Sequence, residues 1–378
     1  MHIGIDGRVL TLRPTGLFNY TYNLLVRMMK HGGHRWTIFA PAPLTASLAA
    51  STTASKGLTI RTYNISNSKL HLPWQQSLLP LMMSGEALDV FWSPHHFLPP
   101  FHQTIPMVCT IVDLIWAGYP QDMRPLRIMI EKRLMERAVS KAAAITAISS
   151  ATEMELYARF PKARNKTTVI PAGVVALPEC SDNTPPVAFP YVLFVGSVQR
   201  RKNLKRLIQA FALLPEDLRT THRLVIAGSH AWGADFHDEI YASKLTNQVL
   251  VTGYVDRERL SCLYKHATVF AIPSLVEGFG LPILEAMSSG VPVLTSNRSS
   301  MAEVAGNAAL LIDPYDITDI SRGLETLLRD KELRRTLILR GYERTLHYSW
   351  DKSAALLLEI LEKAASGREG CRRMTPEI

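Results

Sequence analysis

The order of apolar and polar positions in the C-terminal half predicts alternating buried strands and amphipathic helices. Short apolar runs, most of which end in small or turn-forming residues, are typical of buried parallel strands. They are YVLFVG (191–196), RLVIAG (223–228), QVLVT (248–252), ATVFAI (267–272) and VPVLTS (291–296). Between the first two runs, one apolar stripe predicts a helix from Asn203 to Leu214, with Asn203 as its N-cap. This alternation favours an α/β, doubly wound sheet.

The N-terminal half repeats this pattern less regularly. Its predicted strands are HIGID (2–6), WTIFA (36–40), DVFWS (89–93), PMVCTIV (106–112) and AAITAIS (143–149), and its predicted helices span Gly16–His31 and Pro125–Lys141. A chain of 378 residues is about twice the usual size of one domain. Residues 178–190 hold four prolines without periodicity, which is typical of a linker. We therefore expect domains at 1–177 and 191–350, with a frayed tail at 366–378.

Composition narrows the class of protein. Apolar residues make up 47% and charged residues 20%, which is typical of a folded globular chain. The net charge of +9 suits an anionic partner, which can be a nucleotide diphosphate, an acidic lipid surface or a nucleic acid. The four cysteines form no CxxC pair, so we expect neither a zinc site nor a disulfide framework, and a reducing cytoplasm fits best. No membrane-spanning run or secretion signal is predicted.

The strongest chemical signal is SLVEGFGLPILEAM (274–287), where a strand, a glycine-bearing loop and a helix with Pro282 in its first turn follow one another. Such a loop is a ready anion site, because backbone N–H groups and the helix dipole face the ligand. The N–H groups predicted to face a pyrophosphate are those of Gly278, Phe279, Gly280 and Leu281. Glu277 and Glu285 flank this loop, and sugar or ribose hydroxyls are suitable donors to them. The alternative is that both glutamates are solvated.

A second anion signal is GSVQRRKN (196–203), which lies between a predicted strand and the next helix. Gly196 permits a tight turn, and Arg201 with Lys202 would neutralise a diphosphate at the helix N-terminus. A basic pair at such a turn is alternatively a solvated surface feature. The chain has neither a Walker A loop nor a GxGxxG fingerprint at these turns, which disfavours P-loop chemistry and NAD binding.

From Tyr191 to about Trp350 the chain resembles the donor-binding half of the family 4 retaining glycosyltransferases with the GT-B fold. The motifs that carry this resemblance are VGSVQRRKN, VIAG, TGYVDRERLSCLYKHATVFAIPSLVEGFGLPILEAMSSGVPVLTS and SSMAEVAGNAALLIDPYD, in that order. The resemblance implies two facing Rossmann-like domains with a cleft between them. It also implies a last helix, at about 351–365, that returns to the first domain.

The resemblance also assigns roles to residues of the donor half. Glu277 would contact the donor sugar, Glu285 the ribose, and Lys202 with Arg201 the diphosphate. Main-chain donors would come from Gly280 and Leu281, and the TGYV segment, with Val255 and Asp256, would line the base. The family usually needs no divalent metal, and the sequence holds no DxD triplet at a strand end. We therefore expect no metal and no cofactor beyond the nucleotide-sugar itself, and transfer with retention of anomeric configuration.

The N-terminal half resembles the family's acceptor domain through DGRVLTLRPTGLFNYTYNLL, FWSPHHFLP, IVDL and AISSATEMEL. Gly16 would lie in a loop that faces the cleft. Relatives commonly have His-Asp where this chain has Val112-Asp113, so Asp113 is retained without its histidine. His95 or His96 would approach the acceptor from a strand end, although such histidines are often ordinary loop residues.

The segment from Arg124 to Lys141 alternates apolar residues with six cations. A basic amphipathic helix of this kind can lie on an anionic leaflet, where a lipid-linked acceptor is found. A packed helix with a solvated basic face explains the same pattern.

Taken together, these features predict a cytoplasmic enzyme, in peripheral contact with the membrane if the basic helix binds lipid. It would transfer a hexose, with mannose or a related deoxyhexose from a GDP-sugar favoured, to a polysaccharide or lipid-linked glycan. An epimerase or glycan synthase of the same fold is an alternative, as is an inactive nucleotide-sugar-binding homologue or assembly subunit, which Val112 supports. Nucleic-acid binding is disfavoured because the basic residues are dispersed.

Overall fold

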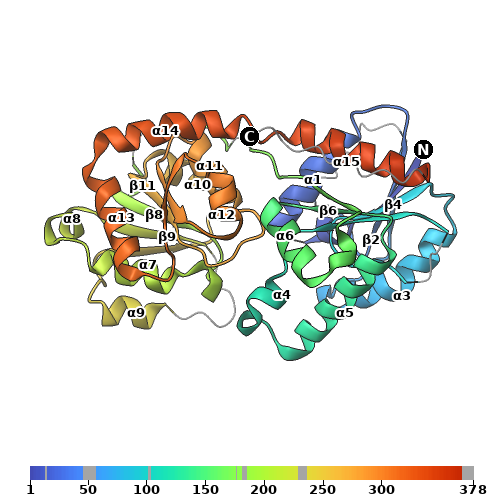
Figure 1. Cartoon of the computed structure of the whole chain (residues 1–378), viewed down its shortest axis with the longest axis horizontal. Helices are drawn as coiled ribbons and strands as arrows, with labels where there is room; N and C mark the ends of the chain where they lie inside the picture. The colour runs from blue at the N-terminus through green and yellow to red at the C-terminus, as the bar shows by residue number, and fades with distance from the viewer. Residues whose placement is uncertain are drawn as a thin grey trace. The chain divides into compact units, whose positions relative to one another are not determined.

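The computed structural model describes residues 1–12, 15–45, 57–100, 104–175, 177–180, 185–228 and 236–367. The chain divides into two compact units. Unit 1 comprises Met1–Leu114, Leu126–Gly173 and the segment that starts at Ser349, and unit 2 comprises Ile115–Pro125 and Val174–Tyr348. Each unit is built on a parallel sheet flanked by helices (Figure 1).

The sheet of unit 1 has seven strands in the described residues, in the order β3-β2-β1-β4-β5-β6-β7. The strands are β1 (His2–Asp6), β2 (Arg35–Ala40), β3 (Leu58–Thr62), β4 (Val90–Ser93), β5 (Met107–Ile111), β6 (Ala144–Ala147) and β7 (Thr167–Val169). All pairings are parallel; Ile3, for example, lies beside Trp36 on one side and Val90 on the other. The chain order therefore reverses between β1 and β4.

Helices cover both faces of this sheet. They are η1 (Arg8–Thr11), α1 (Gly16–Met28), η2 (Ser68–Leu70), α3 (His71–Ser84), α5 (Pro125–Lys141), α6 (Ser150–Arg159), η4 (Pro161–Ala163) and α15 (Trp350–Ala365). Figure 1 shows α1 and α15 on one side of the sheet and α3 and α5 on the other.

Helix α15 is packed firmly into unit 1, although it follows unit 2 in the sequence. The rings of Trp350 and Tyr20 meet edge to face with centroids 5.8 Å apart, and the Ser353 hydroxyl donates to the Pro171 carbonyl at 2.7 Å. Gly173 is required beside it, because a Cβ there would lie 2.4 Å from the Trp350 backbone nitrogen. The burial of the Trp350 and Tyr20 rings against each other holds α15 on unit 1.

The sheet of unit 2 has six parallel strands in the described residues, in the order β10-β9-β8-β11-β12-β13. The strands are β8 (Tyr191–Val195), β9 (Arg223–Ala227), β10 (Val249–Gly253), β11 (Val269–Ile272), β12 (Val293–Ser296) and β13 (Ala309–Ile312). The helices are α4 (Ile115–Gly118), η3 (Pro120–Asp122), η5 (Arg200–Lys202), α7 (Leu204–Ala212), α8 (Glu216–Thr221), α9 (His237–Ala242), α10 (Arg257–Lys265), α11 (Leu281–Ser288), α12 (Ser299–Ala305), α13 (Ile317–Arg329) and α14 (Lys331–Thr345).

Every strand predicted from an apolar run is present, with ends that differ by one to two residues, and the helix predicted at Pro125–Lys141 is confirmed. Strands β3, β7 and β13 were not predicted. β3 is largely exposed at the sheet edge and β7 has three residues, so neither has a clear apolar run. Helix α1 ends at Met28, before the predicted end at His31. Of the predicted linker and tail, residues 181–184 and 368–378 lie outside the described residues.

The prediction that Asn203 is the N-cap of the following helix is confirmed, but its side chain forms no cap hydrogen bond with the helix backbone. Asn203 holds the N-cap position of α7, but in a left-handed conformation with φ +62° and without a side-chain cap hydrogen bond. Its amide donates instead to the carbonyls of Pro273 and Pro314, at 3.0 and 2.6 Å. The side chain therefore ties η5 to the loop after β11, which a local sequence pattern cannot reveal.

The prediction that the cysteines form no disulfide is wrong. Cys180 and Cys262 are bonded to each other, although 82 positions separate them in the sequence. The bond fastens the connection before β8 to α10. Ser261 donates to the Pro178 carbonyl at 2.6 Å and Lys265 to the Cys180 carbonyl at 3.3 Å, so adjacent residues of α10 hold the same segment. Because the pairing depends on tertiary proximity, cysteine spacing did not indicate it.

Candidate functional site

The best-formed site of unit 2 lies where its chain order reverses, between β8 and β11. Ligands of open α/β sheets bind outside the carboxyl ends of the strands at such a point. The GSVQRRKN segment leaves the carboxyl end of β8, and the loop with Glu277 leaves that of β11. Adjacent parallel strands therefore bring together the two anion signals of the sequence.

Glu277, Arg201 and Lys202 form one buried cluster, which we call the unit 2 charge cluster. Arg201 Nη1 donates to Glu277 Oε2 at 2.6 Å, and the Lys202 ammonium pairs with Glu277 Oε1. The Ser274 hydroxyl donates to Oε1 at 3.0 Å. Glu277 is 9% exposed and Lys202 is 7% exposed, so neither is the solvated surface residue of the alternative hypotheses. Sequence reasoning missed that the basic pair and the glutamate bind each other.

Glu277 is ionised at neutral pH. Burial alone would raise the pKa of Glu277, but the adjacent charges and hydrogen bonds of Lys202 and Arg201 outweigh it and lower the pKa to about 2. Burial lowers the pKa of Lys202, and the Glu277 carboxylate opposes this shift. A guanidinium and an ammonium carry more N–H donors than one carboxylate accepts. The cluster holds two cations and one anion, an excess of positive charge.

Backbone contacts fix the loop that carries Glu277. The hydroxyls of Ser299 and Ser300, at the start of α12, donate to the Glu277 carbonyl at 3.0 and 2.9 Å. The Leu275 N–H donates to the Arg201 carbonyl at 2.7 Å. Arg201 and Glu277 are therefore held at both backbone and side chain, as a preorganised site requires.

The start of α11 follows this loop, and Leu281 and Pro282 stand in its first turn as predicted. Gly280 is the N-cap and has φ +100°, where a Cβ would lie 2.4 Å from Met301 Cε. Phe279 is buried and its ring meets Tyr348 edge to face. Gly278 lies between Glu277 and Phe279. The glycine-bearing loop thus leads directly into a helix N-terminus, where backbone N–H groups favour anions.

Glu285 lies one turn further along α11 and has a different partner. The Tyr264 hydroxyl, from α10, donates to Glu285 Oε2 at 3.2 Å. Burial raises the pKa of Glu285, while the Tyr264 hydrogen bond and the charge of Arg257 oppose the shift. Tyr264 was not among the predicted residues, because it carries no motif of its own. It lies in a segment, RERLSCLYK, that reads as an ordinary amphipathic helix.

The remaining donor-side residues border the sheet of unit 2. Gly196 follows β8 and lies against Gly228, which follows β9; a Cβ on Gly228 would lie 1.9 Å from the Gly196 carbonyl oxygen. Val255 and Asp256 follow β10. Asp256 accepts from the Arg259 N–H at 2.8 Å and caps α10, a structural role that the sequence pattern did not predict.

The acceptor-side residues predicted in unit 1 follow three different strands. Gly16 is exposed and opens α1, whose N-cap Thr15 accepts from Phe18 N–H at 3.3 Å. Asp113 is half-buried after β5, and its charge helps burial raise the pKa of Glu155. His95 and His96 follow β4, with ring centroids 4.1 Å apart.

His96 belongs to a second buried charge cluster at the reversal point of unit 1, between β1 and β4, which we call the unit 1 charge cluster. His96 Nε2 lies 2.6 Å from Glu131 Oε2, and Glu131 also pairs with Arg127. Asp6 is the last residue of β1, Arg8 follows the strand, and Arg8 lies 4.7 Å from the centre of the Phe97 ring. His96 is 2% exposed, so the interpretation of ordinary loop histidines is wrong for it.

Electrostatics link the members of the unit 1 charge cluster. Burial raises the pKa of Asp6, and the Arg8 charge opposes the shift. Burial, with the charges of His96, Arg8 and Arg127, lowers the pKa of His95 well below its usual value, so this ring is neutral at neutral pH. Burial would raise the pKa of Glu131, but His96 and Arg127 outweigh it and the net shift is downward. The cluster therefore places the two carboxylates of Asp6 and Glu131 among Arg8, Arg127 and His96.

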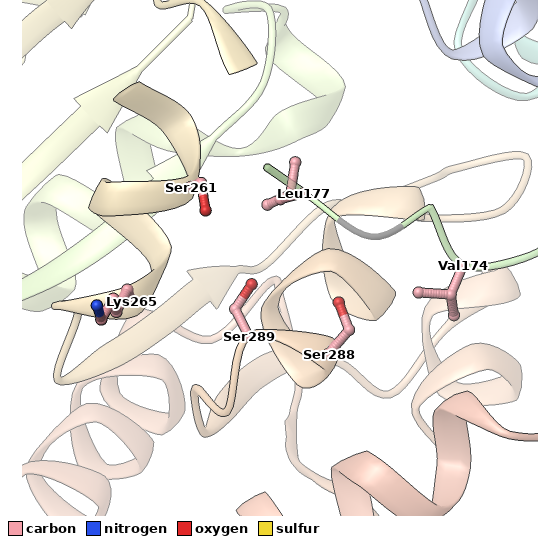
Figure 2. A pocket seen from close by; sticks show the side chains of 6 residues that line it. All are labelled: Val174, Leu177, Ser261, Lys265, Ser288 and Ser289. Carbon is pink, nitrogen blue, oxygen red and sulfur yellow. The ribbon is translucent and has the colours of Figure 1, made fainter. Parts of the chain in front are cut away.

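A pocket of about 290 Å³ opens elsewhere on unit 2, between α10, the end of α11 and the connection before β8 (Figure 2). It is lined by Val174, Leu177, Ser261, Lys265, Ser288 and Ser289. The three serine hydroxyls donate to backbone carbonyls of Pro178 and Glu285. None of the predicted site residues lines this pocket, and its polar groups already serve the protein itself.

Two properties of the described residues concern metal binding and membrane insertion. In the ranges that the structure describes, no group of three or more His, Cys, Asp or Glu residues gathers at one point. None of the helices in the described part of the chain combines the length and apolar character needed to cross a bilayer.

Two Rossmann-like units in one chain, each with a parallel sheet whose chain order reverses near its centre, have the architecture of the GT-B fold. Comparison with known proteins gives the family. The sequence profile for Glycosyl transferases group 1 matches residues 181–344, and that for Glycosyltransferase Family 4 matches residues 14–176. The chain belongs to this family and is a glycosyltransferase.

Individual relatives agree with this assignment. An O-antigen chain mannosyltransferase B from Escherichia coli is 31% identical over 272 residues, which are 69% of this chain and 71% of that protein. A sucrose-phosphate synthase from Thermosynechococcus elongatus superposes with a TM-score of 0.75 at 19% identity, over 97% of this chain and 100% of that one. HepE from Anabaena, in complex with UDP and glucose, gives 0.72 at 16% identity, over 96% of this chain and 100% of that one. At these identities the structural likeness concerns the fold alone.

Proposed function

We propose that this glycosyltransferase moves a hexose from a nucleotide diphosphate sugar to a glycan or lipid-linked saccharide during polysaccharide or lipopolysaccharide synthesis. The sugar is mannose or a related deoxyhexose, and a GDP-sugar is the favoured donor. The likeness to an O-antigen chain mannosyltransferase supports the choice of sugar and pathway class. The observation that carries the proposal is the unit 2 charge cluster beside the N-terminus of α11.

The donor diphosphate binds the positive side of this cluster. Arg201 and Lys202 supply charge-assisted hydrogen bonds, and the N–H groups of Gly278, Phe279, Gly280 and Leu281 supply main-chain donors. The net positive charge of the cluster offsets part of the charge of the diphosphate, the N-terminus of α11 stabilises the remainder, and no metal or other cofactor takes part. HepE, the structural neighbour bound to UDP and glucose, gives general support for a nucleotide-sugar donor.

Glu277 and Glu285 bind hydroxyl groups of the donor. A carboxylate has about four acceptor positions, and Lys202, Ser274 and Arg201 each donate to that of Glu277. The capacity that remains accepts a sugar hydroxyl, and the pKa of about 2 keeps Glu277 anionic for this task. Glu285, oriented by Tyr264, accepts from the ribose hydroxyls. Gly196, Val255 and Asp256 border the nucleotide.

The transfer retains the configuration at the anomeric carbon. The bond between that carbon and the diphosphate oxygen breaks as the acceptor hydroxyl attacks from the same face, and the hydroxyl proton passes to the departing phosphate oxygen. The nucleoside diphosphate is the second product. Arg201 and Lys202 stabilise the negative charge that develops on the leaving group, which is the main electrostatic contribution to catalysis.

The acceptor is bound by unit 1, through Gly16, Asp113, His95 and His96. It is a saccharide, and in the lipid-linked case the enzyme works in peripheral contact with the cytoplasmic face of the membrane. The arginines, His96 and the carboxylates of the unit 1 charge cluster offer both hydrogen-bond donors and acceptors, which suits a hydroxyl-rich ligand.

The test is transfer by purified protein in EDTA, with GDP-mannose, UDP-glucose and dTDP-rhamnose offered separately and a mixed mannan oligosaccharide as acceptor. We expect one donor to be consumed, with an α-linked donor giving an α-linked product by NMR. A product whose anomeric configuration differs from that of its donor would contradict retention, and activity that appears only with added Mg²⁺ would contradict metal independence. Nucleotide binding without transfer or donor hydrolysis would instead identify an inactive homologue.

A further inference from the structure

Arg8 is a buried cation whose guanidinium has no hydrogen-bonded anion. Arg8 and Lys202 are the two lysine or arginine residues that are buried in the described part of the chain, at 8% and 7% exposure. Lys202 pairs with Glu277. The Arg8 guanidinium, by contrast, makes no hydrogen bond and no ion pair with any residue that the structure describes, and it lies 4.7 Å from the centre of the Phe97 ring. Burial of such a charge is costly unless a ligand supplies its partner.

The backbone of Arg8 and the ring that it contacts are both held in place. The Arg8 N–H donates to Asp6 Oδ1 at 2.9 Å, and the Arg8 carbonyl accepts from the Thr11 hydroxyl at 2.8 Å. The Phe97 carbonyl accepts from the Ser93 hydroxyl at 2.8 Å. These bonds leave all five N–H donors of the Arg8 guanidinium for another group. The side chain is therefore preorganised for a ligand.

The carboxylates of the unit 1 charge cluster already have other partners. Glu131 pairs with Arg127, and Asp6 accepts from the Arg8 backbone and from the Gln75 amide at 3.3 Å. Burial lowers the pKa of Arg8 and the charge of Arg127 lowers it further, while the charges of Asp6 and Glu131 oppose the shift. Since an arginine stays protonated in proteins, an additional anion at this guanidinium would be stabilised.

The groups around Arg8 indicate which anion fits. The Arg127 guanidinium lies 5.6 Å from the centre of the same Phe97 ring, so two guanidinium groups approach one ring. The Nδ1 atoms of His95 and His96 are buried and have no hydrogen-bond partner among the described residues. A guanidinium binds the paired oxygens of a phosphate or a carboxylate. Two arginines match the charge of a phosphate dianion better than the single charge of a carboxylate.

We propose that Arg8 binds a phosphate group of the acceptor saccharide. This group belongs to a free sugar phosphate or to the diphosphate of a lipid-linked sugar, and both present the same paired oxygens. Hydroxyls of the adjoining sugar bond to His95 and His96. The inference rests on the proposed function, because it names the class of acceptor. A reaction that forms a sugar–phosphate bond then supplies the acceptor, and the enzyme acts near the start of a glycan chain.

Titration calorimetry with inorganic pyrophosphate tests the site without turnover. The full chain carries Lys202→Met with Glu277→Gln in this measurement, because the unit 2 charge cluster would also bind pyrophosphate. We expect this protein to bind pyrophosphate, and we expect the addition of Arg8→Gln to weaken the affinity roughly 10- to 100-fold, since hydrogen bonds to a charged group are lost. Arg8→Lys keeps the charge without the planar guanidinium and is expected to recover part of the affinity.

Arg164→Gln is the matched control. Arg164 also lies over an aromatic ring of unit 1, 5.4 Å from the centre of the Tyr157 ring, but it is exposed. Its substitution is expected to leave the pyrophosphate affinity unchanged, and circular dichroism checks that each variant is folded. Nitrogen-15 NMR of the histidines needs no substitution at Arg8: the imidazole signals of His95 and His96 are expected to shift when pyrophosphate binds.

Inorganic phosphate and acetate distinguish the classes of ligand. Acetate that binds as tightly as pyrophosphate would overturn the choice of a phosphate. Tighter binding of pyrophosphate than of phosphate would assign the group to a lipid-linked diphosphate, and the opposite order would assign it to a free sugar phosphate.

The proposal and the proposed function fail in different ways. Pyrophosphate that does not bind, an affinity that Arg8→Gln leaves unchanged, or histidine signals that do not shift would overturn the phosphate site. Transfer of a hexose to a neutral mannan by such a protein would keep the proposed function. Pyrophosphate binding through Arg8 in a protein that consumes no nucleotide-sugar would contradict the proposed function and leave the phosphate site standing.

Discussion

The two units carry buried charged residues at equivalent positions of their sheets, but with different sets of cations and carboxylates. Both place a buried ionic cluster at the carboxyl ends of the two strands where chain order reverses, β1 and β4 in unit 1 and β8 and β11 in unit 2. The unit 2 charge cluster sets two cations around one carboxylate, whereas the unit 1 charge cluster sets two arginines and His96 around two carboxylates. We infer that position in the sheet makes a site and that the mixture of donors and acceptors selects its ligand. Two cations around a single carboxylate suit a diphosphate, and a set with more acceptors suits the hydroxyls of a saccharide.

The largest expected effect comes from removing the cations or the anion of the unit 2 charge cluster. Lys202→Ala and Glu277→Ala are each expected to lower transfer on the order of 100-fold or more, because leaving-group electrostatics are lost. Each single change also strands a buried charge, at about 3–5 kcal/mol of unfolding free energy. Steady-state kinetics and urea unfolding measure the two effects separately.

The double variant Lys202→Met with Glu277→Gln is the control for this prediction. It removes both charges of one pair, so stability is expected to recover toward that of the wild type while transfer stays low. Recovery of both activity and stability would mean that the cluster only holds the fold together.

Removing the disulfide allows the stability of unit 2 to be compared with that of unit 1. Unit 2 carries Cys180–Cys262, whereas Cys109 of unit 1 is buried in β5 and outside any disulfide. Cys180→Ser with Cys262→Ser closes no loop in the unfolded chain and is expected to destabilise unit 2 by about 2–4 kcal/mol, with unit 1 unaffected. Hydrogen exchange by peptide locates the loss. Protection lost equally from both units, or from neither, would speak against this account.

A change in unit 1 is expected to act on the acceptor alone. Glu131→Gln weakens the charge-assisted hydrogen bond to His96 and should raise the KM for the saccharide acceptor roughly 10-fold, with the KM for the donor unchanged. Initial rates with each substrate varied in turn make the measurement. A donor KM that rises together with the acceptor KM would contradict the proposal that the unit 1 charge cluster binds only the acceptor.

The smallest effect appears only in acid. The pKa of Glu277 is lowered from 4.5 to about 2 in the folded protein, so its contribution to stability is complete above about pH 4.5 and is lost as pH falls toward 2. Glu277→Gln lacks this titration and should lose less stability than the wild type across that window. Urea unfolding at several pH values tests this, and parallel losses in both proteins would contradict the lowered pKa.

Sequence patterns predicted the elements of the fold well and the pairings poorly. Apolar runs such as YVLFVG and ATVFAI gave buried strands because each lies in the middle of a sheet with both faces covered. Strand β3 was not predicted, because an exposed edge strand has no such apolar run. The bonds of Lys202 to Glu277 and of Cys180 to Cys262 join residues 75 and 82 positions apart. Such contacts are set by strand order, which local periodicity does not encode.

The candidate site shows the same difference between features that local patterns predict and contacts that they do not. The glycine-bearing loop and the basic pair were predicted from local patterns, and family resemblance supplied their roles. Tyr264 and Glu131 were missed as partners, because each lies on a helix whose pattern is fully explained by packing. Asn203 is the predicted N-cap of α7, but its side chain bonds to the loops that hold Pro273 and Pro314. Local sequence patterns thus predicted the segments of the candidate site, and the tertiary structure determines which of their side chains are in contact.

The most direct test of the central claim is titration calorimetry of GDP, UDP, dTDP and ADP in EDTA into wild type and into the Lys202→Met, Glu277→Gln double variant. We predict that one nucleoside diphosphate binds the wild type and that the double variant, still folded, binds it about 100-fold more weakly, since a charge-assisted partner of the diphosphate is gone. Equal affinity in the two proteins would contradict the claim that the unit 2 charge cluster binds the donor.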